Sequence, residues 1–368
     1  MVLASREASE TFIAREIEAL QKRGYPLLVA SLDDLPQAKC KSQKTNRKIS
    51  RRVFEELLAF APRNAWRVWR LRKKIHALSA MARETGATRL HAQFAWIAAD
   101  AAKIAAEVWG IPWSCGAHAW DVFTRPRAEI KRRLRGADFV IACNDRARDA
   151  VARAAACHVH LVRHGVTKQP APVTSQEQDV PATIIAIGRL VPKKGFDTLL
   201  VAMAKACHDA RCVVIGDGPE RGRLEALATR LGIASRVRVA GRLPHTDAMR
   251  ELARATLLAL PSRRTRDNDS DGFANVLTEA MARGVPIVST TAAGAGELLV
   301  DGESALLVPP DNPVEFARAM SRLLADDAFQ KRLADNARRV LETQLNEEVE
   351  IAKTAKLLFG ESQYSFLT

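Results

Sequence analysis

Residues 271–279 read Asp-Gly-Phe-Ala-Asn-Val-Leu-Thr-Glu, and Gly284, Pro286 and the run Ile-Val-Ser-Thr at 287–290 follow. The apolar spacing after the first acid and glycine predicts a helix that ends at Gly284, and residues 287–290 predict a strand. An acid at a loop end, amides at a helix start and a second acid, Glu279, one to two turns further on would suit a nucleotide-diphosphate sugar. The reason is that helix N-terminal amides attract phosphate and carboxylates accept hydrogen bonds from hydroxyls.

The second half of the chain alternates short apolar strands with helices. Strands of about four to six residues, each followed by a helical pattern, predict a parallel sheet with helices on both faces. The runs are apolar on both sides of the pleat, which is typical of strands buried on both faces. The predicted strands are 182–187, 212–215, 237–240, 257–260, 286–289 and 305–308, and the predicted helices are 196–206, 224–231, 249–255, the helix carrying Glu279, and 313–324.

The first half shows the same alternation less regularly. Residues 11–23 have an amphipathic pattern that stops at Gly24 and predicts a helix. Residues 1–4 predict a first strand that the start of the chain cuts short. Later strands are predicted at 27–32, 90–93, 113–116, 139–142 and 160–163.

Residues 167–181 carry three prolines and little apolar content, which is typical of a linker. We therefore expect an α/β protein of two Rossmann-like, doubly wound domains facing a cleft at the carboxyl ends of their sheets. The expected domains are 1–170, with a truncated first strand, and 171–345. Residues 346–368 are expected to be helical and to pack back on the first domain.

The net charge of +14 is distributed unevenly over the 368 residues. Residues 1–170 hold 31 Lys and Arg against 16 Asp and Glu, whereas residues 171–368 hold 25 against 26. This asymmetry indicates an anionic partner for the first half. The segments 39–52 and 54–74 are rich in Lys and Arg, and the second interleaves them with Trp and Leu. Such a helix would suit an anionic membrane surface, and a helix packed on its own domain is an equally good interpretation.

No apolar run approaches the roughly 18 residues that span a bilayer, and no secretory signal is expected at the start. The six cysteines are scattered and lack paired CxxC spacing. That pattern favours reduced thiols over a disulfide frame or a zinc site. We therefore expect a cytoplasmic protein.

Three loops at predicted strand ends carry candidate binding residues. Arg189 and Lys194 place a forked guanidinium and a compact ammonium on one loop, where they could neutralise a diphosphate without a metal. Gly216, in Gly-Asp-Gly-Pro, and Arg242, in Gly-Arg-Leu-Pro, could hold a nucleotide. For each segment taken alone, an ordinary solvated loop or tight turn is the alternative.

Histidines also follow predicted strands. His118, in Gly-Ala-His-Ala-Trp-Asp, could donate to a sugar hydroxyl or a phosphate, but a lone histidine at a strand end can equally be structural. His91 and His164 carry the same ambiguity.

Taken in order, these pieces resemble the retaining, nucleotide-sugar-dependent glycosyltransferases of family four with the GT-B fold, in particular those of exopolysaccharide and lipopolysaccharide synthesis. The likeness covers residues 184–324 and short segments of the first half. The matching elements are the Gly188–Gly195 loop, Gly216–Pro219, Pro261-Ser262, Asp271–Pro286, Gly296-Glu297, Ser9–Phe12, His91–Phe94, Ala117–Asp121 and His164–Val166.

The resemblance implies roles for individual residues. Arg189 and Lys194 would bind the donor diphosphate, and Glu279 would accept hydroxyls of the ribose. Asp271 would face the transferred sugar, and His118 would contact the donor sugar or phosphate. These last two, with Arg189 and Lys194, are the expected catalytic residues. The remaining expected donor contacts are Gly216, Arg242, Gly272, Phe273, Ala274, Asn275, Val276 and Leu277.

Two departures from the family pattern bear on these roles. The family usually has Glu where this chain has the shorter Asp271. The related Asp-Gly branch usually continues with Ile-Pro, where this chain has Phe273-Ala274. The chain also starts inside the first strand, so most of that strand and its glycine-containing loop are expected to be missing.

The implied function is transfer of a hexose, with retention, from a UDP or GDP sugar to a lipid-linked or polysaccharide acceptor at the cytoplasmic membrane face. Residues 1–170 would hold the acceptor and residues 171–345 the donor. No further cofactor and no metal ion is expected, and no nucleic-acid partner, because no recognition motif accompanies the charge. The alternatives are a catalytically impaired GT-B protein that binds an anionic surface, or another GT-B sugar-nucleotide enzyme such as an epimerase.

Overall fold

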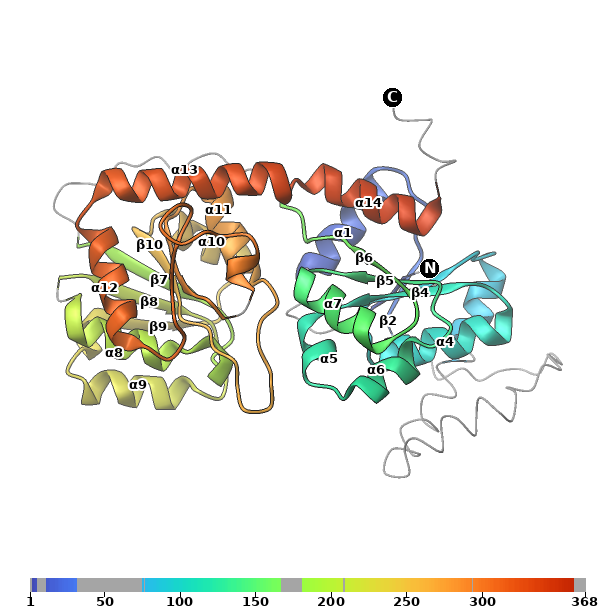
Figure 1. Ribbon diagram of the computed structural model, residues 1–368, viewed down its shortest axis with the longest axis horizontal. Coiled ribbons are helices and arrows are strands. Elements are labelled where there is room, and N and C mark those ends of the chain that lie inside the picture. Colours follow the sequence, from blue (N-terminus) through green and yellow to red (C-terminus); the bar gives the residue numbers. More distant parts are fainter. Residues whose placement is uncertain are drawn as a thin grey trace. The chain divides into compact units, whose positions relative to one another are not determined.

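The computed structural model describes residues 2–4, 11–31, 75, 77–166, 181–207, 209–292 and 294–360. It contains two compact units: unit 1 comprises Met1–Arg163 and Ile351–Thr368, and unit 2 comprises His164–Glu350 (Figure 1). The basic segments at 39–52 and 54–74 and almost all of the predicted linker lie outside the described residues.

Unit 2 is built on a six-stranded parallel sheet in the order β12-β11-β10-β7-β8-β9. The first strand of the unit is central, and later strands are added on one side and then on the other, which is the Rossmann order. In the register, Ile184 of β7 is paired with Cys212 of β8 and with Leu257 of β10. The strands are β7 (Thr183–Ile187), β8 (Arg211–Ile215), β9 (Val237–Gly241), β10 (Leu257–Leu260), β11 (Ile287–Thr290) and β12 (Leu306–Val308).

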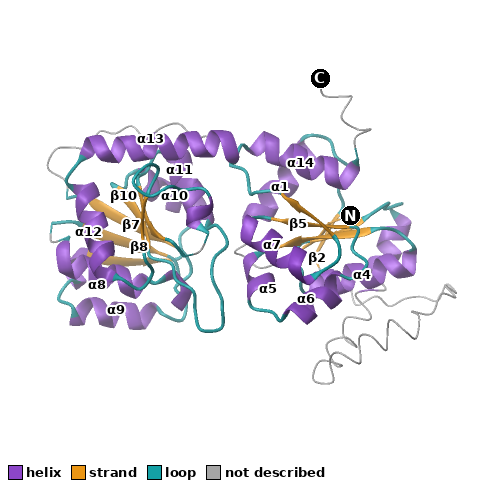
Figure 2. Ribbon diagram, in the orientation of Figure 1, coloured by secondary structure: helices purple, strands orange, loops and turns teal. Residues whose placement is uncertain are grey.

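Helices cover both faces of this sheet (Figure 2). Along β7, Ile184 and Ala186 pack with α8, α9 and α12, whereas Ile185 packs with α10, α11 and α13. Burial on both faces is the reason why the strands read as continuous apolar runs. The helices are α8 (Phe196–Ala206), α9 (Arg221–Arg230), α10 (His245–Ala253), α11 (Asn275–Arg283), α12 (Pro313–Leu324) and α13 (Asp327–Gln344), with short 3-10 turns η1 (Pro192–Lys194), η2 (Ala234–Arg236) and η3 (Ala295–Glu297).

Local sequence signals set the ends of these helices. Helix α11 stops at Gly284, whose φ of +67° is the left-handed cap that glycine adopts without strain. Helix α12 starts with Pro313 in its first turn, and the side chain of Asn312 accepts the backbone N–H of Glu315 at 3.1 Å. These are the stops and starts that the sequence predicts.

Unit 1 holds a second six-stranded parallel sheet, in the order β2-β1-β3-β4-β5-β6. Val140 of β5 lies in a core with α4, α6 and α7, whereas Phe139 and Ile141 face the opposite side and pack against α14. Leu20 of α1 packs against Ile351 of α14. The strands are β1 (Val2–Ala4), β2 (Val29–Ser31), β3 (Leu90–Ala92), β4 (Trp113–Ala117), β5 (Phe139–Ala142) and β6 (His158–Leu161), and the helices are α1 (Thr11–Lys22), α4 (Ile97–Trp109), α5 (Ala119–Phe123), α6 (Arg127–Leu134), α7 (Asp145–Ala154) and α14 (Glu347–Phe359).

Several elements differ from the sequence prediction, among them β6, α10 and α13. Strand β6 lies two residues earlier than predicted, because it alternates exposed histidines with half-buried Val159 and Leu161 instead of forming a continuous apolar run. Helix α10 starts four residues earlier than predicted, directly after Pro244. Helix α13 was not predicted as a separate element.

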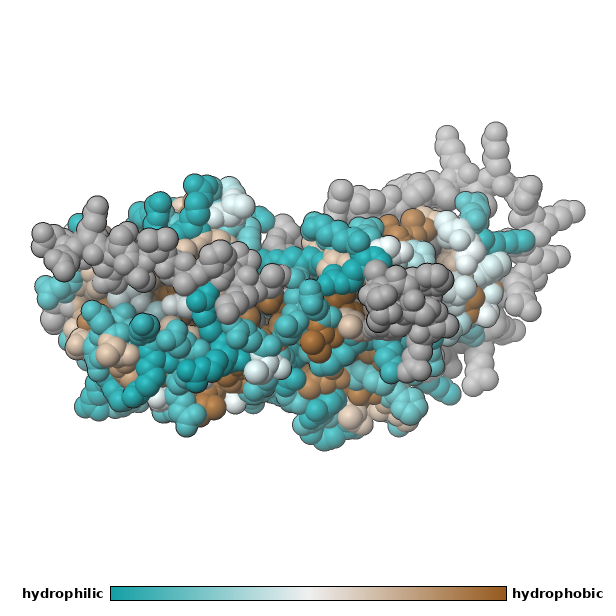
Figure 3. Space-filling view, turned by 90° about the horizontal axis from the view of Figure 1, so that it is seen from above, coloured by the Kyte–Doolittle hydropathy of each residue, from teal (hydrophilic) through white to brown (hydrophobic). Residues whose placement is uncertain are grey.

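The described helices include none that is both long and apolar enough to span a membrane. Among the described residues on the face seen in the space-filling view, hydrophilic residues predominate and hydrophobic residues form small groups between them (Figure 3).

Candidate active site

At the carboxyl ends of the unit 2 strands, the loops after β7 and β8 approach each other so closely that one position must be glycine. After β8, the N–H of Gly216 donates to the carbonyl oxygen of Gly241 at 2.9 Å. Gly216 has a φ of +145°, and a Cβ atom there would lie 1.9 Å from the carbonyl oxygen of Gly188. The loops after β7, β8 and β9, which carry Arg189, Gly216 and Arg242, therefore meet at one edge of the sheet.

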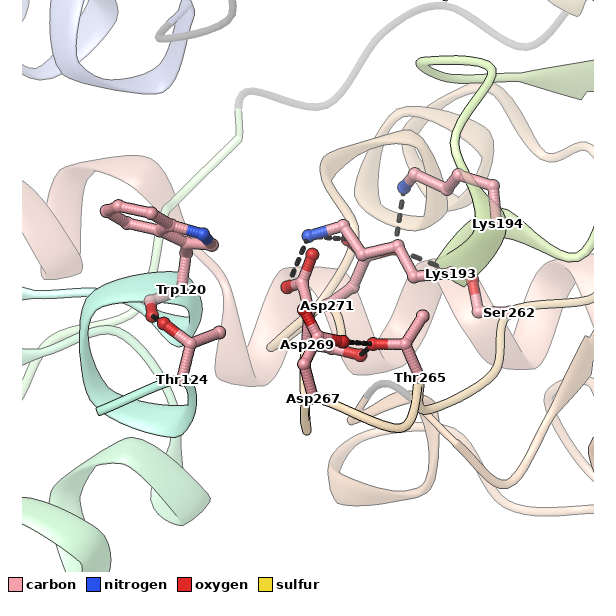
Figure 4. Close-up of polar contacts among 9 residues, drawn as sticks. All are labelled: Trp120, Thr124, Lys193, Lys194, Ser262, Thr265, Asp267, Asp269 and Asp271. Atoms are coloured by element: carbon pink, nitrogen blue, oxygen red, sulfur yellow. Dashed lines mark hydrogen bonds and ion pairs between the residues drawn. The ribbon is translucent and has the colours of Figure 1, made fainter. Parts of the chain in front are cut away.

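Two lysines and two acids meet between the loops after β7 and β10 (Figure 4). The Nζ of Lys194 lies 2.6 Å from Oδ2 of Asp271. The neighbouring Lys193 Nζ lies 2.9 Å from Oδ1 of Asp269 and 3.5 Å from Oδ1 of Asp271. Strands β7 and β10 are adjacent where the strand order reverses, and Rossmann sheets bind ligands at this point.

The Lys194–Asp271 pair is shielded from water, with side chains 11% and 13% exposed. Burial alone would raise the pKa of the Asp271 carboxyl, but the charges of Lys194 and Lys193 outweigh it and hold that pKa below its ordinary value. Asp271 is therefore an acceptor-only carboxylate at neutral pH.

Arg189 lies on the same loop as Lys194 but is exposed. Within the part of the chain that the structure describes, its guanidinium makes no hydrogen bond or ion pair. The loop is held at its other end by Gly195, whose φ is +65° and whose added Cβ would lie 2.0 Å from the carbonyl oxygen of Pro261. The β7 loop thus has a fixed base and carries one solvated guanidinium.

Helix α11 begins beside the lysine–acid cluster, after the turn formed by residues 271–274. The amides of Asn275 and Val276 precede the first intrahelical bond and have no acceptor within the helix. The N–H of Leu277 already donates to the carbonyl oxygen of Ala274 at 2.8 Å. The side chains of Val276 and Leu277 are buried in the core. These two residues can therefore contact a donor only through their backbone.

Glu279, one turn into α11, is buried and faces a histidine that the sequence argument did not select. Its Oε1 lies 3.0 Å from Nε2 of His245, which begins α10 and is more exposed. The pair combines a buried acceptor with an accessible ring at the carboxyl edge of the sheet. Such a pair could bind vicinal hydroxyls.

His118 belongs to unit 1, where it follows β4. Its Nε2 lies 3.4 Å from Oε1 of Gln93, and Nε2 of Gln93 lies 3.4 Å from Oε2 of Glu16. Thr354 of α14 donates to Glu16 at 3.0 Å. Phe94, with a left-handed φ of +76°, places its ring centroid 4.6 Å from that of His118. These contacts fix the His118 ring at the carboxyl edge of its sheet.

Other polar residues near His118 have supporting roles. Asp121 is fully buried and accepts the backbone N–H groups of Ala95 and His118, and burial raises its pKa to about 7. His91 is buried with Nδ1 2.9 Å from Oγ of Ser114, and burial lowers its pKa to about 3. For His91, these contacts favour the structural alternative over a binding role.

Three residues of the site, Lys193, Asp269 and His245, were not predicted from the sequence. Lys193 precedes Lys194 directly in the sequence, and only the structure shows it buried between two acids. A signal for Asp269 existed in the alternation Asp-Asn-Asp-Ser-Asp at 267–271, which places acids at every second position of one loop. His245 carried no local signal, because its partner is 34 residues away in sequence.

Comparison with known proteins identifies the class to which this fold and site belong. The family of group 1 glycosyl transferases matches residues 168–340, and glycosyltransferase family 4 matches residues 9–169. Together the two matches cover both units. The chain belongs to the group 1, family 4 glycosyltransferases and has the GT-B fold, as predicted.

Individual relatives agree with this assignment. A lipopolysaccharide core biosynthesis glycosyltransferase of Rhizobium meliloti is 35% identical over 46% of this chain and 48% of its own length. A GDP-mannose-dependent phosphatidylinositol monomannoside mannosyltransferase of Mycobacterium tuberculosis is 30% identical over 49% of this chain and 48% of its own length. The matches to these curated relatives span about half of their length.

Solved structures extend the likeness to the whole fold. The structure of Anabaena HepE in complex with UDP-glucose superposes with a TM-score of 0.72 over 97% of this chain and 98% of its own, at 18% sequence identity. At this identity the likeness concerns the fold.

Proposed function

We propose that this protein transfers a hexose, with retention at the anomeric carbon, from a nucleotide-diphospho-sugar to a lipid-linked or polysaccharide acceptor at the cytoplasmic membrane face. The observation that carries the proposal is the cluster of Lys194, Lys193 and Asp271 at the strand-order reversal, beside the start of α11. Family membership and relatives that act on lipopolysaccharide or a phosphatidylinositol glycolipid support the substrate class.

The donor half of the reaction needs positive groups fixed at the leaving diphosphate. The bond between the anomeric carbon and the diphosphate oxygen breaks, and its electron pair goes to the diphosphate. Arg189, Lys194 and the amides of Asn275 and Val276 would stabilise this charge, the usual form of electrostatic catalysis. Arg189 supplies a fork for two oxygens, and Lys194 supplies a point charge.

The acceptor half needs no protein nucleophile. The acceptor oxygen attacks the anomeric carbon from the face that the diphosphate leaves, and its proton passes to a diphosphate oxygen. Asp271 would orient the sugar and favour an oxocarbenium-like state through its negative charge. His118 would donate to the sugar or phosphate.

Recognition of the nucleotide would use other residues at the carboxyl edge of the unit 2 sheet. Glu279 and His245 would bind the ribose hydroxyls, and the backbone around Gly216 and Arg242 would hold the base. UDP-glucose in HepE and GDP-mannose for the mycobacterial relative support either nucleotide as donor.

A thermal-shift panel of UDP, GDP, ADP and their hexose derivatives tests the donor assignment. Selective stabilisation by one nucleotide is expected, since a ligand that binds only the folded state raises its melting temperature. Equal response to every nucleotide, or to none, would contradict a built donor site.

The matching mutation is Arg189→Ala. We expect turnover of the stabilising donor to fall by about 100-fold or more, because removing one charge-stabilising donor typically has that effect. The control is Arg230→Ala, an exposed arginine at the far end of α9, which should keep normal turnover. Near-normal turnover in Arg189→Ala would refute the diphosphate role.

A further inference from the structure

Two indoles and two guanidinium groups form a layered cluster in unit 1, outside the residues used above. The guanidinium carbon of Arg125 lies 3.6 Å from the ring centroid of Trp96, and that of Arg133 lies 4.0 Å from it. Arg125 also lies 4.8 Å from the ring centroid of Trp120. The two indoles meet edge to face, with centroids 5.5 Å apart and an interplanar angle of 78°.

The distances fix the order of the layers. Two guanidinium groups on the same face of one ring, both within about 4 Å of its centroid, would overlap, because carbon atoms pack no closer than about 3.5 Å. Arg125 and Arg133 therefore lie on opposite faces of Trp96. The indole of Trp96 separates two cations, a favourable arrangement for each of them.

The two cations differ in how their charge is compensated. Arg133, which is 8% exposed, lies 3.3 Å from Asp100 and 3.0 Å from Glu129. Arg125 has no carboxylate partner among the described residues, and its Nε is buried without a hydrogen-bond partner there. Among the described residues, Arg133 is therefore paired with two acids, whereas Arg125 keeps an uncompensated charge and an unused donor.

Trp120 completes the open side of the cluster. It lies in α5, two residues after His118 at the carboxyl edge of the sheet, and it is 42% exposed. Its turn is fixed by Thr124, whose hydroxyl donates to the carbonyl oxygen of Trp120 at 2.6 Å (Figure 4). An exposed indole alone needs no explanation. Here the indole lies beside the guanidinium of Arg125, which has no carboxylate partner among the described residues.

We propose that Trp120 and Arg125 form a binding site for the acceptor, and that the acceptor is a pyranose carrying an anionic group. The indole would stack on the C–H face of the sugar ring, and the guanidinium would bind a phosphate or carboxylate. The proposal rests on the proposed function, because it takes the ligand of unit 1 to be a glycan. It adds the chemical class of that glycan and two residues that recognise it.

The test uses the full chain labelled with 5-fluorotryptophan and followed by 19F NMR, with the Trp120 signal assigned from Trp120→Phe. The probes are glucose 6-phosphate, glucose and inorganic phosphate. We expect saturable movement of the Trp120 signal with glucose 6-phosphate, at about tenfold lower concentration than with either probe lacking one of the two groups. Trp109, which faces Arg83 in the same unit, is the internal control and should not move.

Two variants separate recognition from folding. Arg125→Gln should weaken the binding of glucose 6-phosphate about tenfold and bring its affinity level with that of glucose, while the signal of Trp109, which pairs with Arg83, keeps its position. Arg125→Lys keeps the charge without the fork and should recover part of the loss.

Several outcomes would overturn the proposal. No movement of the Trp120 signal with glucose 6-phosphate would do so. Equal affinities for inorganic phosphate and glucose 6-phosphate would also do so, because they would indicate an anion site without sugar recognition. Movement with phosphatidylglycerol vesicles but not with glucose 6-phosphate would assign the cluster to a membrane. The nucleotide panel on the same sample distinguishes failure of this proposal from failure of the proposed function. Normal nucleotide binding without movement of the Trp120 signal would reject the acceptor site but not the donor site.

Discussion

The ammonium group of Lys194 lies 2.6 Å from Asp271, yet the proposed reaction requires the same group at the diphosphate. Asp271 and the donor therefore compete for one cation. Binding of the diphosphate would draw Lys194 away and release the carboxylate toward the sugar, while Lys193 stays with Asp269 and keeps Asp271 near its place. In the proposed reaction, the pair would couple binding of the diphosphate to exposure of the Asp271 carboxylate.

This competition predicts opposite effects of Asp271→Asn on binding and on turnover. The affinity for inorganic pyrophosphate, measured by calorimetry, should rise by about tenfold, equivalent to about 1.4 kcal/mol, because Lys194 loses its competing charge. Turnover should fall, because the carboxylate that orients the sugar is gone.

The control for Asp271→Asn is Asp267→Asn, which removes the same charge from an exposed position of the same loop. Asp267 contacts the hydroxyl of Thr265 instead of a lysine. Its variant should bind pyrophosphate as the parent protein does. A loss of affinity in Asp271→Asn, or an equal gain in both variants, would be inconsistent with the competition.

His91 gives a pH-dependent contribution to stability. Burial lowers its pKa to about 3, whereas an unfolded histidine has a pKa of about 6.5. Below pH 6.5 the unfolded chain binds a proton that the folded chain does not, so stability is lost as the pH falls from 6.5 toward 3. At pH 5 this loss amounts to about 2 kcal/mol.

Urea unfolding at pH 7 and pH 5 measures this loss. His91→Asn should show a free energy of unfolding that depends less on pH, by about 2 kcal/mol over this interval. His158→Asn, at an exposed position of β6, should behave as the parent protein. An unchanged pH dependence in His91→Asn would assign the effect to other groups.

At the scale of elements, the proposed donor site depends on the close contact between the loops after β7, β8 and β9. Gly216→Ala should cost about 2–4 kcal/mol, because the added Cβ collides with the carbonyl oxygen of Gly188 and alanine is strained at this φ. The distorted β7 loop should also weaken nucleotide binding. Gly222→Ala, in α9 with open space around its Cβ, should be neutral or stabilising by up to about 1 kcal/mol. Equal melting temperatures for the two variants would argue against a close contact between Gly216 and the β7 loop.

At the scale of the whole molecule, the charge belongs almost entirely to residues 1–170. The proposed membrane-face acceptor predicts binding to phosphatidylglycerol vesicles that weakens steeply between about 0.1 M and 1 M salt, where the screening length falls from about 10 Å to about 3 Å. Co-sedimentation measures it, with phosphatidylcholine vesicles as the control. Binding that does not respond to salt, or that is equal for both lipids, would contradict an electrostatic contact.

The sequence by itself determined the class of the protein and most of its framework. Strands β5 and β10 and helix α12 have the predicted limits, and α11 ends at Gly284 as predicted. Each is specified locally, by an apolar run, a proline or a glycine within a few residues. Asp271, Lys194 and Glu279 could be selected because they lie close to or within such elements: Lys194 precedes α8, Asp271 precedes α11 and Glu279 lies in α11.

Only the tertiary structure decided which charged groups meet. Lys193 and Asp269 are 76 residues apart, and His245 and Glu279 are 34 apart, so no local pattern pairs them. The same holds for the layering of Arg125, Trp96 and Arg133, which depends on how α4 and α6 pack. Local signals determine where helices and strands begin and end, but the burial and pairing of side chains depend on which elements the fold brings together.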